Sequence, residues 1–125
     1  MLNEKQIFTA EKLCLSGADL LRHNDAKKVC NGIGPEWFPP WLRLLVNTLC
    51  PALILAAQIH DMRYHLGGSG SNRRAADAEF MANALIIAEA KYKYFPPAMW
   101  ITEWIALKMF RLLRLAGNTA WRTDT

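Results

Sequence analysis

The sequence predicts a single all-α domain, and three observations support this class. Apolar residues recur at helical spacing in long runs, glycines and prolines separate these runs, and the length of 125 residues suits one domain with its own core. The chain is 52% hydrophobic and 21% charged, which is typical of a folded protein and not of a disordered one. We therefore expect residues 1–125 to form one domain.

The first predicted helix covers residues 3–23. Asn3 is a suitable N-cap, because its side chain can accept a hydrogen bond from the first turn. The pair Ser16-Gly17 marks a point where this helix can break. The expected inward positions are apolar: Phe8, Leu13, Leu20 and Leu21.

Residues 24–40 are predicted to connect the first helix to the next one. The segment contains Asn31-Gly32-Ile33-Gly34-Pro35, and two glycines followed by a proline cannot continue a helix. We expect turns here, with backbone carbonyl oxygens free to bind a ligand.

Three more helical runs complete the predicted fold. Residues 41–66 form the first, which kinks or restarts at Pro51. The glycine-rich turn 67–70 ends it, and Ser71 or Asn72 is expected to cap a helix that reaches about residue 94. Phe95-Pro96-Pro97 ends that helix, and the last one covers about residues 98–116, with Gly117-Asn118 as its C-cap.

His60-Asp61-Met62-Arg63-Tyr64 is the first group of residues that could carry chemistry. His60 and Tyr64 lie four positions apart and share a helix face, and Leu53 and Ala57 extend that face as an apolar stripe. His60 is therefore expected to point toward the core. Asp61 lies about 100° farther round the helix and addresses a different target.

Asp77 lies on the apolar stripe of the following helix. The other positions of that stripe are Phe80, Met81, Ala84, Leu85 and Ala88. A buried carboxylate needs partners, because unpaired burial is costly. A short turn makes the two helices antiparallel and brings Asp77 toward His60, at an expected distance of about 3 Å. Asp77 would then fix the tautomer of the imidazole, although each residue alone is more often structural.

Taken in order, these motifs resemble the calcium-dependent phospholipases A2, in the cysteine-poor forms of parvoviral, bacterial and phage proteins. The family pattern has a glycine-containing calcium loop, a helix with His-Asp-x-x-Tyr, and an antiparallel helix with an inward Asp. The segments of this sequence that correspond to these parts lie within residues 29–90. They are, in order, Gly32-Ile33-Gly34, His60-Asp61-Met62-Arg63-Tyr64 and Ala76-Asp77-Ala78-Glu79-Phe80. The resemblance implies a fold of two antiparallel core helices flanked by N- and C-terminal helices.

The resemblance also implies an activity, the hydrolysis of the sn-2 acyl ester of a phospholipid. His60 would activate a water, Asp77 would orient His60, and Tyr64 would brace Asp77. The expected cofactor is Ca²⁺, bound by the carboxylate of Asp61 and the backbone carbonyls of Cys30, Gly32 and Gly34. Calcium prefers oxygen ligands of these kinds.

Other readings of the same residues remain open. A metal-dependent phosphohydrolase would need more ligands, and the remaining histidines, His23 and His65, form no matching motif. The three cysteines, Cys14, Cys30 and Cys50, match no zinc motif or nucleophile motif and suggest buried thiols in a reducing compartment. The main alternative is an inactive phospholipase-like fold that binds a membrane, a protein or a nucleic acid.

The net charge of +4 favours an anionic partner. The last helix is expected to have a charged arc and an apolar side opposite it. The charged positions are Glu103, Lys108, Arg111 and Arg114, and the apolar positions are Ile101, Ile105, Met109, Leu112 and Leu113. Either this arc is solvated, or the helix lies at a phospholipid surface. Trp100, Trp104 and Trp121 favour an anionic membrane surface, and no nucleic-acid-binding motif stands out.

The sequence also bears on the location of the protein. Residues 1–20 carry Glu4, Glu11 and Asp19 and no continuous apolar stretch, so we expect no signal peptide. No transmembrane segment is expected either. The protein would be cytoplasmic or associated with a phage or virion, or exported by a non-classical route.

Overall fold

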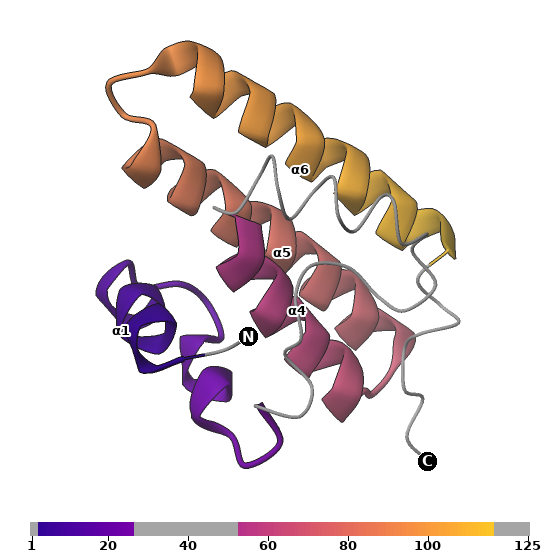
Figure 1. Ribbon diagram of the computed structural model, residues 1–125. Coiled ribbons are helices and arrows are strands. Elements are labelled where there is room, and N and C mark those ends of the chain that lie inside the picture. Colours follow the sequence, from indigo (N-terminus) through magenta and orange to yellow (C-terminus); the bar gives the residue numbers. More distant parts are fainter. Residues whose placement is uncertain (1–2, 27–52, 117–125) are drawn as a thin grey trace.

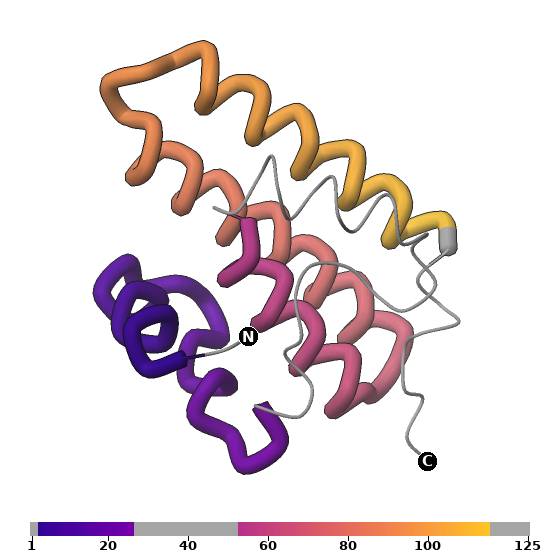
Figure 2. Tube along the Cα trace, in the orientation of Figure 1, coloured from indigo at the N-terminus to yellow at the C-terminus, as the bar shows by residue number. Residues whose placement is uncertain are grey.

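The computed structural model describes residues 3–26 and 53–116, and these residues fold as helices without strands (Figure 1). This confirms the all-α class. The helices are α1 (Glu4–Lys12), the 3₁₀ helix η1 (Ala18–Arg22), α4 (Ile54–Leu66), α5 (Gly70–Lys91) and α6 (Pro96–Ala116). The chain runs up and down through α4, α5 and α6, while α1 and η1 pack at one side (Figure 2).

The N-terminal segment differs from the single helix predicted over residues 3–23. Asn3 does cap α1, in a reciprocal pair of hydrogen bonds with Gln6. The helix ends at Lys12, Cys14 has a φ of 55°, and Gly17 has a φ of 81°, so the chain turns before η1 begins. A Cβ on Gly17 would come within 2.8 Å of the Ile59 side chain, so glycine also permits the close approach to α4.

The rotation of α1 was also partly mispredicted. Phe8 is 63% exposed, whereas Ile7 and Ala10 are buried in the core. Leu21 is buried as expected, and Leu13 and Leu20 pack against the core at its edge. The inward face of α1 is therefore narrow and consists of small or medium-sized side chains.

Helices α4 and α5 form the predicted antiparallel pair (Figure 1). Gly67 and Gly68 adopt positive φ values of 73° and 134°, which reverses the chain. Ser69 caps α5, because its hydroxyl accepts a hydrogen bond from the Asn72 amide. The expected caps, Ser71 and Asn72, instead lie inside the first turn, so α5 begins earlier than predicted.

A polar clamp ties the turn between α1 and η1 to the α4–α5 pair. The buried side chain of Asn83 accepts a hydrogen bond from the Ser16 amide and donates one to the Ser16 carbonyl. Glu79 accepts bonds from the Ser16 hydroxyl and from the Arg63 guanidinium. These bonds hold the N-terminal segment over the middle of α5.

Helix α6 packs antiparallel along α5 and begins with Pro96, at a position where proline needs no intrahelical donor (Figure 1). Its buried positions include Thr102, Ala106, Met109 and Leu113. The predicted inward positions Ile101 and Leu112 are exposed instead, so the rotation of α6 was mispredicted in part. Among the described helices, none is long and apolar enough to cross a membrane.

Candidate functional site

The site lies where α4 and α5 face each other. His60 and Tyr64 stand one turn apart on α4, and both are buried. The structure brings the His60 Nε2 atom to 2.8 Å from Asp77 Oδ1, at the distance expected from the sequence. The imidazole also packs against the rings of Tyr64 and Phe80, with centroids 4.3 Å and 5.5 Å away. Its orientation is therefore set by one hydrogen bond and two ring contacts.

Tyr64 takes the position expected for a residue that braces Asp77. Its hydroxyl donates a hydrogen bond to Asp77 Oδ1 at 2.7 Å, so this oxygen lies between the imidazole and the phenol. When Asp77 is ionised, it only accepts hydrogen bonds, and Nε2 of a neutral His60 must then carry the proton. The other ring nitrogen, Nδ1, is left as the basic atom of the imidazole.

Arg114 completes the surroundings of Asp77 and was not predicted as a site residue. Its Nη1 atom donates to Asp77 Oδ2 at 2.6 Å. The sequence predicts that Arg114 lies on the charged arc of α6, which faces either solvent or a phospholipid surface, yet its side chain is only 30% exposed. Arg73, near the start of α5, donates to the carbonyl oxygens of Leu113 and Arg114 and so holds the end of α6 in place.

The charge state of Asp77 follows from these contacts. The side chain is fully buried, and burial by itself raises the pKa of a carboxyl group. Hydrogen bonds from His60, Tyr64 and Arg114 outweigh this effect and lower the pKa of Asp77 below its ordinary value. Asp77 is therefore an anion near neutral pH, which is the state that orients His60.

Tyr64 shows the opposite response, which gives a first prediction. Burial, followed by the bond to the Asp77 carboxylate, raises the pKa of the Tyr64 phenol well above its ordinary value. We expect Tyr64→Phe to leave the rise in absorbance at about 295 nm between about pH 9 and pH 11 nearly unchanged. Tyr92→Phe is the matched comparison at a less buried tyrosine. A clear loss of amplitude in Tyr64→Phe would contradict the buried contact.

The expected calcium ligands are only partly described by the structure. Asp61 follows His60 on α4 and is half-buried, while Cys30, Gly32 and Gly34 lie outside the described residues. Within residues 3–26 and 53–116, no group of three or more His, Cys, Asp or Glu side chains could hold a metal ion. The expected site has a single carboxylate and several backbone oxygens, a donor set that suits calcium better than zinc.

The other two histidines lie apart from His60. His65 Nε2 is 3.0 Å from Asp25 Oδ2, and the Asp25 amide donates to His23 Nδ1. The contact between His65 and Asp25 connects the segment after η1 to the end of α4. Cys14 is exposed and free, contrary to the expected burial, while Cys30 and Cys50 lie outside the described residues.

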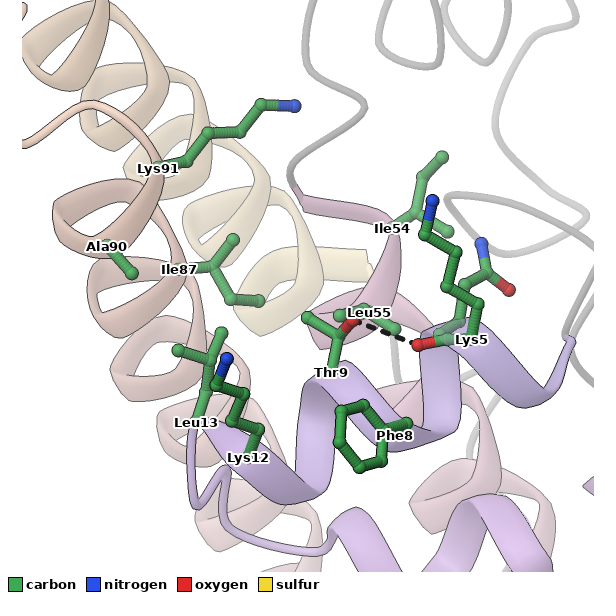
Figure 3. A pocket seen from close by; sticks show the side chains of 11 residues that line it. Lys5, Phe8, Thr9, Lys12, Leu13, Ile54, Leu55, Ile87, Ala90 and Lys91 are labelled. Atoms are coloured by element: carbon green, nitrogen blue, oxygen red, sulfur yellow. Dashed lines mark hydrogen bonds between the residues drawn. The ribbon is translucent and has the colours of Figure 1, made fainter.

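A groove of about 650 Å³ opens between α1, the start of α4 and the end of α5 (Figure 3). Its walls are mainly apolar, with Leu13, Leu55 and Ile87 among them, and three lysines line it as well: Lys5, Lys12 and Lys91. Sequence reasoning did not single out this groove, because its residues come from three separate elements.

Comparisons with family models, with curated proteins and with solved structures found no match to this chain.

Proposed function

We propose that this chain is a calcium-dependent hydrolase that cleaves the sn-2 acyl ester of phospholipids. The observation that carries the proposal is the buried arrangement of His60, Tyr64 and Asp77, in which one carboxylate oxygen of Asp77 accepts hydrogen bonds from both of the other side chains. A histidine with one nitrogen held by a carboxylate and the other nitrogen basic suits general-base catalysis.

In the proposed reaction, His60 Nδ1 removes a proton from a water as that water attacks the ester carbonyl. The imidazolium that forms is stabilised by ionised Asp77, and His60 then returns the proton to the departing alkoxide oxygen. Tyr64 and Arg114 keep Asp77 ionised and in place. Asp61 and the carbonyls of Cys30, Gly32 and Gly34 would hold calcium, which when bound polarises the ester carbonyl.

The direct experiment measures fatty-acid release from mixed phospholipid vesicles, with calcium present and with calcium removed by a chelator. We expect release from wild-type protein only when calcium is present. Folded protein that releases no fatty acid from any phospholipid tested would remove the enzymatic proposal.

Calcium binding gives a second prediction, which needs no turnover. Calcium that binds only the folded state should raise the melting temperature by mass action, at roughly millimolar concentrations for a weak site. Asp61→Asn should abolish this rise. Asp25→Asn is a matched control, because it removes a carboxylate that contacts His65 elsewhere on the surface. Equal calcium responses in wild type and Asp61→Asn would contradict the assigned ligand.

An inactive fold that binds a membrane is the second candidate function. The exposed aromatic residues of α6 favour it, because they need no intact catalytic site. Vesicle binding by the wild type without fatty-acid release would favour this candidate over the enzyme.

A further inference from the structure

The outer face of α6 is the largest exposed apolar feature of a single described helix. We define it by seven exposed residues: Trp100, Ile101, Trp104, Lys108, Arg111, Leu112 and Leu115. Trp100, Ile101 and Trp104 are each at least 60% exposed, and Leu115 is 82% exposed. At about 100° per residue, all seven fall within an arc of about 120°.

The face opposite this arc is fully used by the core. Thr102, Ala106, Met109 and Leu113 are buried where α6 packs along α5. Folding of the domain therefore does not need the tryptophans and leucines of the outer face. Large apolar side chains gathered on one exposed helix face indicate a binding surface.

The charges on the outer face indicate what this surface binds. Lys108 and Arg111 lie among the apolar residues, and the Lys108 ammonium lies 5.3 Å from the ring centre of Trp104. The acidic residue of α6, Glu103, lies outside the arc and is half-buried. Tryptophan, leucine and cationic side chains on one helix face suit the boundary between the headgroups and acyl chains of an anionic bilayer.

We infer that the outer face of α6 docks flat on an anionic phospholipid bilayer, with Trp100, Ile101, Trp104 and Leu115 in the headgroup layer and Lys108 and Arg111 against lipid phosphates. From Trp100 to Leu115 the face extends over about 22 Å of helix. Tyr94 and Phe95 in the connection before α6 are also exposed. This inference deepens the membrane-binding candidate above by naming the face and the lipid charge, and docking requires no step at His60.

Two other occupants fit the same face less well. A second copy packed face to face would bring four cations, Lys108 and Arg111 from each copy, together in an interface that excludes water, which is unfavourable. A nucleic acid would satisfy Lys108 and Arg111 but would leave Ile101, Leu112 and Leu115 without an apolar partner. A bilayer surface satisfies both the charges and the apolar side chains.

The experiment is co-sedimentation with vesicles, in the absence of calcium, so that docking is separated from turnover. Wild-type protein should bind vesicles that contain phosphatidylglycerol and bind phosphatidylcholine vesicles more weakly. Lys108→Glu/Arg111→Glu should weaken binding at least about tenfold, because each cation near an anionic surface contributes roughly fivefold in affinity and this variant reverses two of them. Trp100→Ser/Trp104→Ser should reduce binding to both kinds of vesicle.

The matched control is Lys5→Glu/Lys12→Glu on α1, which lies on the other side of α5 from α6 in Figure 1. It changes the net charge by the same amount as the α6 pair and should retain most of the binding. Equal losses in the two pairs would overturn the inference, since net charge alone would then explain binding. Absence of vesicle binding by the wild type, a dimer that depends on the α6 tryptophans, or tighter binding to RNA would also overturn it.

A soluble short-chain phospholipid separates this inference from the proposed function. We expect the α6 variants to hydrolyse this dispersed substrate as the wild type does. Vesicle binding without any hydrolysis would support the docking face and contradict the proposed enzymatic activity. Hydrolysis of the soluble substrate without vesicle binding would support the enzymatic activity and contradict the docking face.

Discussion

His60→Gln should abolish nearly all calcium-dependent fatty-acid release while leaving the protein folded and able to bind calcium. Loss of a general base typically costs a factor of roughly 10² to 10⁴ in rate. Glutamine can keep a hydrogen bond to Asp77 in place of His60 Nε2, which is 2.8 Å away, but it cannot take a proton from water. The measurements are fatty-acid release, the melting temperature, and its rise with calcium.

The control for this variant is His65→Gln, which changes a histidine on the same helix. His65 is half-buried and contacts Asp25, away from Asp77, so activity should stay close to that of the wild type. Asp77→Asn should cost less activity than His60→Gln, because it acts through the orientation of His60. A melting temperature that falls in His60→Gln without a selective loss of activity would show that His60 is a core residue only.

The core of the site was predictable because it depends on local geometry. His60 and Tyr64 share a face through their spacing alone, and the short glycine turn before α5 leaves an antiparallel pair as the natural arrangement. Asp77 then faces His60 because it shares the apolar stripe of α5. Their contact follows from two helical periods and one turn.

Arg114 was not predictable by the same reasoning. It lies 37 positions after Asp77, and its place depends on the connection between α5 and α6 and on the rotation of α6. A helical pattern with Thr102 inside and Ile101 outside runs against simple apolar periodicity. Packing against α5 sets this rotation, and the small side chain of Ala106 is fully buried there.

The errors near the N-terminus have a similar origin. Phe8 was expected inside because it is large and apolar, but the face of α1 that packs on the core carries Ile7 and Ala10. Cys14 adopts a positive φ that residues other than glycine seldom take, so no pattern placed the end of α1 there. Tertiary contacts, such as the bonds between Asn83 and Ser16, hold this turn.

Among single substitutions of partly exposed residues of the site, we expect Arg114→Met to lower the free energy of unfolding most. Asp77 is fully buried, and Arg114 is the cationic partner of its Oδ2 atom. Removing one partner of a buried ion pair leaves an uncompensated charge, which typically costs 3–5 kcal/mol. We expect a loss of about 3 kcal/mol, at the low end, because Arg114 is partly exposed and His60 and Tyr64 still donate to Asp77.

The pH dependence of this loss identifies its cause. Asp77 has a lowered pKa in the folded protein, so its contribution to stability is present above the unfolded pKa of about 3.9 and is lost as the pH falls through the folded pKa. Arg114→Met raises the folded pKa and reduces this contribution. Wild type and variant should therefore differ most near neutral pH and approach each other below about pH 4.

Urea unfolding at several pH values measures both effects, and two further variants test their origin. Arg111→Met removes an exposed arginine from the same helix and should change the free energy of unfolding by less than about 0.5 kcal/mol. Asp77→Asn combined with Arg114→Met should recover more than half of the stability lost in the single variant, because the buried charge is then gone. A loss of stability that is independent of pH and persists in the double variant would contradict this explanation. Arg114 would then contribute packing along α6 and not charge compensation, and His60 and Tyr64 alone would keep Asp77 ionised.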